Sequence, residues 1–248
     1  MAPTKEIQGS KDESFSTITT APDSQINANA SRHYWEGIEA NDNGMLGGYA
    51  QVSRVDLRGS RSFLVKLGFG PKEGVKAIGR ALEGGAGIGR ITHGLLLDLA
   101  ETVDVVEPIA KFTEALAKRE GVGRIFNIGL EDWRPDEAKG ISYDVIWNQW
   151  CLGHLTDPQL EEYLVRCKSV LSVGKDGKVR GIIIVKENMS TRQEDVFDDT
   201  DSSVTRQEKT FRLIFEKAGL RIVKTALQHG LPSELYPVRM FALKPKDS

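Results

Sequence analysis

The stretch Leu82-Glu83-Gly84-Gly85-Ala86-Gly87-Ile88-Gly89-Arg90 lies where an apolar segment turns into a helix-forming one. Glycines at such a turn let the backbone approach a ligand closely, and a helix start offers free N–H groups to an anion. The spacing Gly85-x-Gly87-x-Gly89 departs from the dinucleotide fingerprint, because Arg90 stands where its last glycine would be. We interpret this loop as a ligand-binding turn after the first strand of a sheet. A tight strand–helix turn without a ligand is the alternative.

Strand and helix patterns alternate along the rest of the chain. The expected strands lie near 76–83, 102–107, 124–129, 143–149 and 180–187, and the expected helices near 89–100, 109–119, 157–172 and 204–218. Such alternation is typical of βαβ units, so we predict an α/β fold whose mostly parallel sheet carries helices on both faces. Residues 221–227 and 238–243 read as two more strands joined by a loop alone. They predict an antiparallel hairpin at one edge of the sheet.

The N-terminal part has a different composition. Residues 1–30 are rich in Ser, Thr, Asp, Asn and Gln and hold few large apolar side chains to offset chain entropy. We therefore expect a disordered tail over 1–30 and a single folded domain over 31–248. Within that domain we expect a helical extension over about 31–70, with an amphipathic helix around Ser60–Leu67 and a loop at 69–74.

Composition argues against several classes of protein. The 248 residues fit one large domain plus a tail, and the net charge of −2 offers no basic field for nucleic acid or an acidic membrane. No apolar run reaches the roughly 18 residues that span a bilayer, and the N-terminus lacks the apolar core of a secretory signal. Cys151 and Cys167 have no metal-ligand spacing, so we expect reduced thiols, no metal, and a cytoplasmic or nuclear protein.

Three features suggest what the glycine-rich loop binds. Glu107 ends the second expected strand about 20 residues past the loop, where such sheets place an acid on ribose hydroxyls. Arg90 offers a bidentate fork that suits a carboxylate, such as that of a methionyl group. The segment around Leu130 and Glu131 follows the third strand, where an adenine ring could be held. Together they indicate an adenosine-containing ligand, although each residue could instead be an ordinary loop or surface residue.

The fourth strand carries aromatic and polar residues to the same edge of the sheet. It runs through Trp147, which we expect in the core, to Gln149 and Trp150, and His154 follows four residues later. Trp150 could line a substrate slot or simply pack at the rim. A lone histidine is more often structural than catalytic, so a structural role is the alternative for His154.

An acidic loop follows the fifth strand, which ends in Lys186-Glu187-Asn188-Met189. Phe197-Asp198-Asp199-Thr200-Asp201-Ser202-Ser203 places three carboxylates within four residues. Asp and Ser are good N-caps, so the cluster could start the next helix. The functional interpretation is an electronegative mouth that attracts a cationic substrate.

Several of these segments together resemble the protein N-terminal methyltransferases, the α-N-methyltransferase family that modifies Xaa-Pro-Lys N-termini. The matching strings occur in family order from about residue 31 to 245. They are Tyr34-Trp35, Gly44-Met45-Leu46-Gly47-Gly48-Tyr49, Gly85-Ala86-Gly87-Ile88-Gly89-Arg90-Ile91-Thr92, Gln149-Trp150, Gly153-His154-Leu155-Thr156-Asp157, Asn188-Met189 and Asp198-Asp199-Thr200-Asp201-Ser202-Ser203-Val204. The second and the last string are specific to that family, whereas the glycine-rich loop is common to many methyltransferases.

The resemblance implies a seven-stranded Rossmann-like class I methyltransferase fold and S-adenosyl-L-methionine as methyl donor, with S-adenosyl-L-homocysteine as product. It implies that Gly85, Gly87, Arg90, Glu107, Leu130, Glu131 and Gln149 bind the cofactor. It implies that Trp35, Leu46, Gly47, Trp150, Asn188, Asp198, Ser203 and Tyr236 bind the peptide, and that Asp201 and His154 act on the amine. The implied partners are proteins with an Xaa-Pro-Lys or Xaa-Pro-Arg start, such as ribosomal or chromatin proteins.

The chain departs from the family pattern in its acids. Glu83 and Glu107 replace shorter aspartates, and Glu131 stands at a glutamine position, which puts the cofactor affinity in doubt but not the class. Two alternatives stay open. One is a methyltransferase that acts on another protein site or on a small molecule, since a fold does not fix a substrate. The other is an inactive adaptor that keeps the fold for partner binding.

Overall fold

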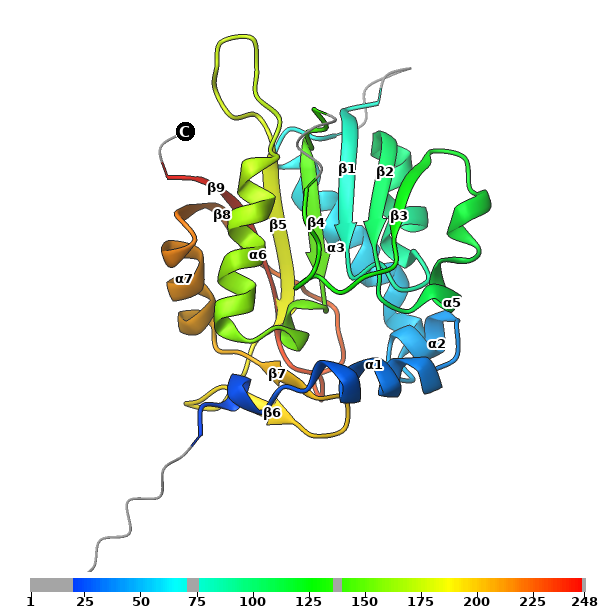
Figure 1. The fold of residues 1–248 in the computed structure, drawn as a ribbon, viewed down its shortest axis with the longest axis vertical. Helices are drawn as coiled ribbons and strands as arrows, with labels where there is room; N and C mark the ends of the chain where they lie inside the picture. The colour runs from blue at the N-terminus through cyan, green and yellow to red at the C-terminus, as the bar shows by residue number, and fades with distance from the viewer. Residues whose placement is uncertain (1–19, 71–75, 136–139, 247–248) are drawn as a thin grey trace, which may run out of the picture.

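The computed structural model describes residues 20–70, 76–135 and 140–246. Its central element is a seven-stranded sheet in the order β3-β2-β1-β4-β5-β9-β8 (Figure 1). The strands are β1 (Ile78–Gly84), β2 (Ala100–Val106), β3 (Val122–Phe126), β4 (Val145–Gln149), β5 (Ile182–Asn188), β8 (Leu220–Leu227) and β9 (Val238–Pro245). Strands β1 to β5 pair in parallel, and β9 pairs antiparallel with both β5 and β8. The predicted α/β fold with a mostly parallel sheet and an antiparallel C-terminal pair is confirmed.

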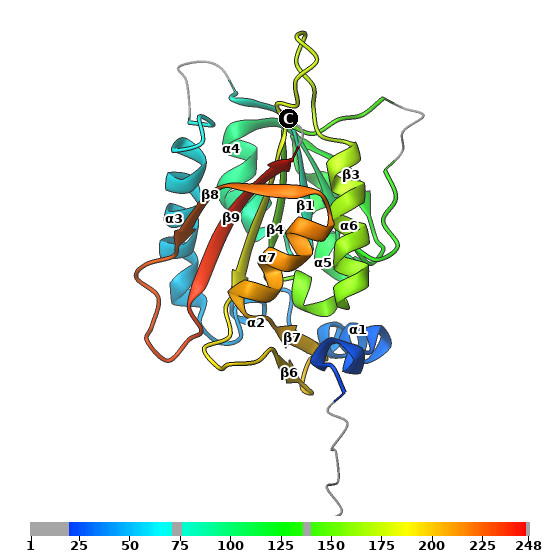
Figure 2. The ribbon, with the colours of Figure 1, turned by 90° about the vertical axis from the view of Figure 1, so that its left-hand side faces the viewer.

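Helices cover both faces of this sheet (Figure 2). One face carries α3 (Ser53–Val65), the π-helical segment η3 (Thr92–Leu96) and α4 (Leu97–Leu99); the other carries α6 (Asp157–Ser169) and α7 (Glu208–Lys217). The short segments α5 (Ala110–Thr113) and η4 (Leu116–Lys118) connect β2 to β3. Each face has its own apolar cluster, and Trp147 is fully buried in the cluster on the α3 side, as expected.

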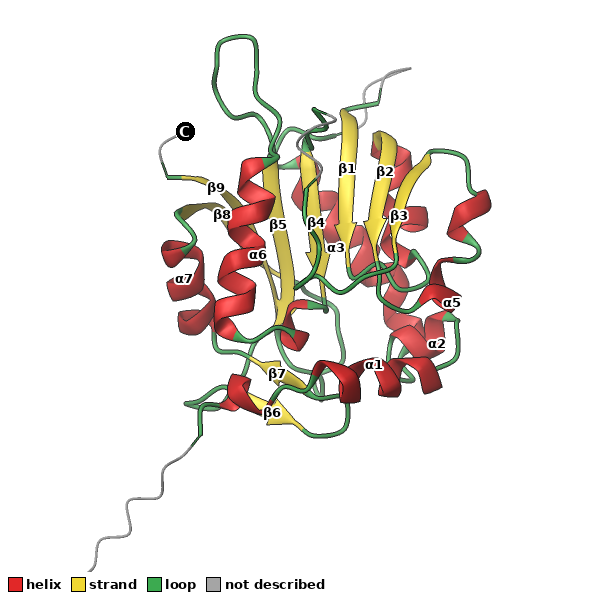
Figure 3. Cartoon of the chain, viewed as in Figure 1, coloured by secondary structure: helices red, strands yellow, loops and turns green. Residues whose placement is uncertain are grey.

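A third set of elements lies across the carboxyl ends of the parallel strands (Figure 3). It consists of η1 (Pro22–Gln25), α1 (Ala28–Gly37), α2 (Asp42–Met45), η2 (Ala50–Val52), η6 (Leu152–His154) and the hairpin of β6 (Val196–Asp198) and β7 (Ser203–Thr205). Helix α1 begins where the Asn27 side chain accepts hydrogen bonds from the backbone N–H groups of Asn29 and Ala30. Because ligands of open α/β sheets bind outside the carboxyl strand ends, these elements form the walls of the expected site.

Three expectations need correction, and a fourth falls largely outside the described residues. Residues 22–30 are ordered, because Asn27 caps α1 and the Asp23 carboxylate accepts the backbone N–H of Asp157; residues 1–19 lie outside the described chain. The helix expected at 60–67 begins at Ser53 and ends at Val65. The helix expected at 204–218 begins at Glu208 with Gln207 as its N-cap, so the acidic loop does not cap it and instead turns the β6–β7 hairpin. The loop expected at 69–74 falls largely on residues outside the described chain.

None of the helices described here is long and apolar enough to span a bilayer. Both cysteines are buried and free. Cys151 follows β4 at the carboxyl edge of the sheet, and Cys167 lies in α6.

Candidate functional site

A cavity opens at the carboxyl ends of β1, β2 and β4, beneath α1. It encloses about 1000 Å³ of empty space, counted out to its open mouth. All residues expected to bind the cofactor line it, namely Gly85, Gly87, Arg90, Glu107, Leu130, Glu131 and Gln149. Of the other expected site residues, Trp35, Trp150 and His154 line it as well. The cofactor-binding residues predicted from the sequence thus lie together in the lining of one cavity that is large enough for a ligand.

The glycine-rich loop is shaped by close backbone contacts. Gly85 has a φ of +64°, and a Cβ atom there would lie 2.2 Å from the Cβ atom of Cys151, so a larger residue cannot stand at this position. The backbone N–H of Gly85 donates to the carbonyl of Val106 at 2.8 Å. Gly87 packs against Met45: a Cβ atom added to Gly87 would lie 2.8 Å from the sulfur atom of Met45. The loop and α2 therefore meet tightly over one end of the cavity.

Glu107 braces this loop from the end of β2. One oxygen of its carboxylate accepts the N–H of Gly87 at 2.7 Å, and the other accepts the N–H of Ile109 at 2.9 Å. Burial raises the pKa of Glu107, although these two backbone hydrogen bonds oppose the shift. Each carboxylate oxygen keeps a second lone pair, so the side chain can both hold the loop and accept a ligand hydroxyl.

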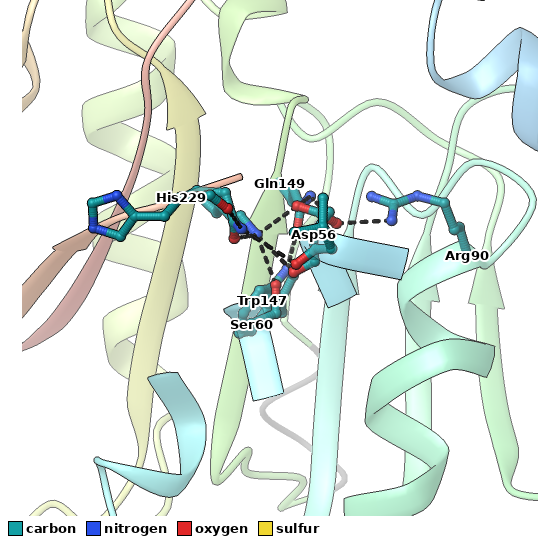
Figure 4. A network of polar contacts seen from close by, with 9 residues as sticks. Asp56, Ser60, Arg90, Trp147, Gln149 and His229 are labelled. Carbon is teal, nitrogen blue, oxygen red and sulfur yellow. Dashed lines mark hydrogen bonds and ion pairs between the residues drawn. The ribbon is translucent and has the colours of Figure 1, made fainter. Parts of the chain in front are cut away.

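A buried cluster of charges lies beside the cavity (Figure 4). Asp56 of α3 contacts Nη1 of Arg90 at 2.8 Å, Nζ of Lys186 at 2.5 Å and Nε2 of Gln149 at 3.0 Å. The side chains of Asp56 and Lys186 are fully buried, and that of Arg90 is only 9% exposed. Ser60, Gln228 and Trp147 supply the remaining polar contacts to Lys186 and Gln149.

The cluster holds two cationic side chains and one anionic one. Burial opposes ionisation of Asp56, but the charges of Lys186 and Arg90 prevail and lower its pKa. Burial lowers the pKa of Lys186 to about 8, so Lys186 still carries its proton at neutral pH. One positive charge is therefore unbalanced, and within the described chain only Nη1 of Arg90 makes a hydrogen bond. An entering carboxylate would balance this charge and accept hydrogen bonds from the remaining N–H groups of the guanidinium.

Helix α1 closes the cavity from the other side. Nη2 of Arg32 contacts the carboxylate of Glu131 at 2.5 Å and that of Asp132 at 3.7 Å. Glu131 follows Leu130, which is 5% exposed and forms an apolar wall of the cavity. The acid at position 131 thus has a local partner in α1.

His154 lies between α1 and the acidic hairpin. Its Nδ1 atom is 2.9 Å from Oγ of Ser31, and its Nε2 atom is 3.2 Å from Nε1 of Trp35. Burial lowers the pKa of His154, although the charge of Asp201 opposes this shift. A neutral imidazole at neutral pH is the form that can accept a proton.

Two buried polar atoms near His154 have no hydrogen-bond partner among the described residues. They are Oδ1 of Asp201 and Nε1 of Trp150. An unpaired buried acceptor is costly unless a ligand or water satisfies it. Backbone strain gathers here too, because Trp150 and Ser202 have φ values of 53° and 55°, in the left-handed region that non-glycine residues rarely adopt. These features are typical of a binding site for a hydrogen-bonding group.

The other expected peptide contacts do not line the cavity itself. Leu46 and Gly47 follow α2, Asn188 ends β5, and Tyr236 lies in the loop before β9. Asp198 and Ser203 face each other as a pair in the β6–β7 hairpin. Asp201 and Asp198 both raise the pKa of Tyr34, after the larger effect of burial, so all three lie near one another. All of these residues belong to elements at the carboxyl edge of the sheet.

The sequence interpretation missed residues that the fold brings to the site. Asp56 and Lys186 were not expected as partners, although a lysine directly after the apolar run Ile182-Ile183-Ile184-Val185 is a signal for a buried ion pair. Ser31 and Arg32 contact His154 and Glu131, more than 95 residues away in sequence. Among the described residues, no group of three or more His, Cys, Asp or Glu side chains is placed to hold a metal ion.

Known proteins can now be compared with this geometry. Residues 23–244 match the model of the family described as AdoMet dependent proline di-methyltransferase. The chain is 42% identical to alpha N-terminal protein methyltransferase 1 of Schizosaccharomyces pombe, over 87% of this chain and 94% of that protein. It is 44% identical to N-terminal Xaa-Pro-Lys N-methyltransferase 1 of Mus musculus, over 85% of this chain and 92% of that protein. A solved SAM-dependent methyltransferase of Leishmania major superposes with a TM-score of 0.76 at 33% identity, covering 88% of this chain and 82% of that one.

Proposed function

The chain belongs to the family of AdoMet-dependent proline di-methyltransferases, and from this membership we propose that it methylates the free α-amino group of proteins that begin with Xaa-Pro-Lys or a similar sequence. The methyl donor is S-adenosylmethionine. We propose that the catalytic domain includes η1 and α1 and so begins near residue 22, and that it acts in the cytoplasm or nucleus, with ribosomal or chromatin proteins among its substrates.

The observation that carries this proposal is the unpartnered Oδ1 atom of Asp201 beside His154. An α-ammonium group is a compact donor that would satisfy this acceptor and the unbalanced charge of the acidic hairpin. The three carboxylates of Asp198, Asp199 and Asp201 gather negative charge in one turn, which attracts a peptide with a cationic N-terminus and a lysine. We assign Asp198 to the third-position lysine.

The cofactor fits the residues that line the cavity. Arg90 would hold the methionyl carboxylate, because the Asp56–Lys186–Arg90 cluster has one unbalanced positive charge. Glu107 would accept ribose hydroxyls, Leu130 would cover the adenine, and Gly85, Gly87, Glu131 and Gln149 would complete the contacts. When bound, the cofactor supplies an electrophilic methyl group on a sulfonium. The residues of this chain must then align the amine with that methyl and relieve it of a proton.

The proton is the main chemical task of the protein side chains. An α-amino group has a pKa of roughly 7.7–8.0, so only about 10–20% of it is neutral at pH 7. We propose that His154 and Asp201 remove the proton, and that alignment in the cavity contributes several kcal/mol through proximity. Trp35, Trp150, Leu46, Gly47, Asn188, Ser203 and Tyr236 would hold the first residues of the peptide.

Mass spectrometry tests the proposal directly. Peptides that begin with Ala-Pro-Lys and Ser-Pro-Lys are incubated with enzyme and S-adenosylmethionine, next to an acetylated Ala-Pro-Lys peptide as matched control. We expect mass increases of one or more methyl groups on the free peptides only. Methylation of the acetylated peptide would point to a lysine or other side-chain methyltransferase, and absence of both S-adenosylmethionine binding and transfer would point to an inactive adaptor.

A further inference from the structure

The imidazole ring of His154 is held between two side chains of α1. Oγ of Ser31 lies 2.9 Å from Nδ1, and Nε1 of Trp35 lies 3.2 Å from Nε2. Ser31 and Trp35 are four residues apart, so they share one face of the helix. The Trp35 and His154 rings also meet edge to face, with centroids 6.1 Å apart at 88°. Both ring nitrogens of His154 therefore have a defined partner.

The chemistry of these partners decides where the ring carries its proton. An indole N–H can donate a hydrogen bond but cannot accept one. Nε2 of His154 must therefore accept from Trp35, which requires an unprotonated Nε2. In the neutral ring the single proton is then on Nδ1, where Oγ of Ser31, 6% exposed as a residue, accepts it.

We propose that Ser31 is a positioning residue: Trp35 donates to Nε2 and Ser31 accepts the proton on Nδ1, so that Nε2 is the basic nitrogen of the site. This inference rests on the proposed function, in which His154 takes a proton from the substrate. The α-ammonium group is a donor like the indole N–H, so the same Nε2 lone pair suits both. When the ammonium group binds, the indole N–H of Trp35 no longer donates to Nε2.

The proton step balances within these groups. The lone pair of Nε2 forms the new N–H bond, and the electron pair of the broken ammonium N–H bond stays on the α-nitrogen as its lone pair. The positive charge passes to the imidazolium ring, whose Nδ1–H still donates to Ser31. Solvent later takes the proton from Nε2 and restores the neutral ring.

Charged groups from three elements surround the ring. Asp201 in the β6–β7 turn, Glu131 after β3 and the backbone carbonyl of Ser202 favour the imidazolium form, while burial disfavours it. Arg32 of α1 partly neutralises Glu131 through its ion pair. Loss of the Ser31 acceptor removes one stabilising contact from the imidazolium, so it lowers the pKa of His154 further.

The tautomer can be measured without any turnover. The chain has four histidines, and 15N-histidine labelling of the full-length protein gives one pair of ring-nitrogen resonances for each. The His154→Asn variant identifies the pair of His154 by its absence. We expect a protonated, pyrrole-like Nδ1 and an unprotonated, pyridine-like Nε2 in the wild type. A protonated Nε2 in the neutral ring overturns the proposal.

Variants then separate Ser31 from a merely structural residue. In Ser31→Ala we expect a mixture of tautomers in the spectrum. We expect kcat to fall on the order of 3–10-fold, a fraction of the contribution of a general base. The apparent pKa of the acidic limb of the kcat/KM profile should fall by about 0.5–1 pH unit. Ser31→Thr keeps the hydroxyl and should restore the wild-type spectrum. Ser172→Ala is the matched control, because it removes a serine hydrogen bond to Asp144 at the opposite edge of the sheet and should change neither readout.

Two results contradict the role of Ser31. One is a Ser31→Ala spectrum and pH profile identical to those of the wild type. The other comes from Trp35→Phe, which removes the indole donor and can be used if Ser31→Ala fails to fold. In this variant we expect Ser31 to keep the proton on Nδ1. Loss of the proton from Nδ1 in Trp35→Phe would assign the effect to Trp35. Failure of the wild type to methylate any Xaa-Pro-Lys peptide would instead refute the proposed function, since the tautomer is read independently.

Discussion

Arg90→Ala tests the assignment of the cofactor carboxylate most directly. Arg90 is nearly buried, and its Nη1 contacts Asp56 at 2.8 Å. The variant removes one of the two cations around Asp56 and leaves the other, Lys186, in place with Gln149. The cluster without ligand then becomes electrically balanced, so we expect the variant to fold with a melting temperature near that of the wild type. An added carboxylate, in contrast, no longer finds an unpaired positive charge.

The expected loss follows from that lost contact. A charge-assisted hydrogen bond contributes about 1.5–3 kcal/mol, which corresponds to a Kd for S-adenosylmethionine weaker by about 10–150-fold. Isothermal titration calorimetry measures this Kd for S-adenosylmethionine and S-adenosylhomocysteine, which share the methionyl carboxylate. Methylthioadenosine keeps the adenosine part but lacks the carboxylate, so its affinity should stay unchanged.

Arg61→Ala is the matched control for this variant. Arg61 also pairs with an aspartate, Asp98, at 2.6 Å, but this ion pair lies at the surface and lends at most about 1 kcal/mol to stability. We expect no change in cofactor affinity. An unchanged affinity of folded Arg90→Ala for S-adenosylmethionine, or an equal loss for methylthioadenosine, would show that Arg90 does not hold the carboxylate.

Three further predictions concern the amine, the peptide and pH. Asp201→Asn should lower kcat on the order of 10²–10⁴-fold at pH 7 and recover part of its rate at pH 9, where the substrate amine is largely neutral; near-normal kcat at pH 7 beside an inactive His154→Asn would assign the base to His154 alone. Asp198→Asn should raise KM mainly for peptides with Lys or Arg at the third position, and equal losses with a neutral third residue would make Asp198 structural. Burial raises the pKa of Glu83 to about 8. Between the ordinary carboxyl pKa and pH 8, the native state therefore keeps a proton on Glu83 that the unfolded state has lost. The free energy of unfolding should fall over this range as the pH rises, by at most about 1.4 kcal/mol per pH unit. Urea unfolding at pH 5 and pH 8 should show that Glu83→Gln gains stability relative to wild type at the higher pH; a difference independent of pH would mean that Glu83 is ionised in the fold.

The parts of the site that sequence could predict are those that topology fixes. A glycine-rich turn after the first strand and an acid at the end of the second must meet at one sheet edge, so Gly85, Gly87 and Glu107 fall together whatever the loops do. Arg90 follows in the same turn and lines the same cavity.

The contacts that sequence could not predict join distant segments through side chains. Lys186 and Asp56 are 130 residues apart, and the helix that carries Asp56 was expected to start several residues later than it does. The order of residues 22–30 depends likewise on partners far along the chain, because a stretch this polar has no packing of its own and is held by capping and by Asp157 and Ser202. Composition alone predicts that such a segment is disordered, because the distant residues that hold it are not visible in its local sequence.

The anchoring of α1 also bears on how the protein is made. The backbone N–H of Asn27 donates to Oγ of Ser202, across a separation of 175 residues. At a synthesis rate of about 5–20 residues per second, α1 therefore leaves the ribosome roughly 10–35 s before the hairpin that anchors it exists. During that interval the helix lacks the Ser202 contact at its start, and it lacks the His154 contacts of Ser31 and Trp35 until His154 itself has been made. The β6–β7 hairpin precedes β8 and β9 along the chain, so the wall over the cavity can close before the last two strands complete the sheet.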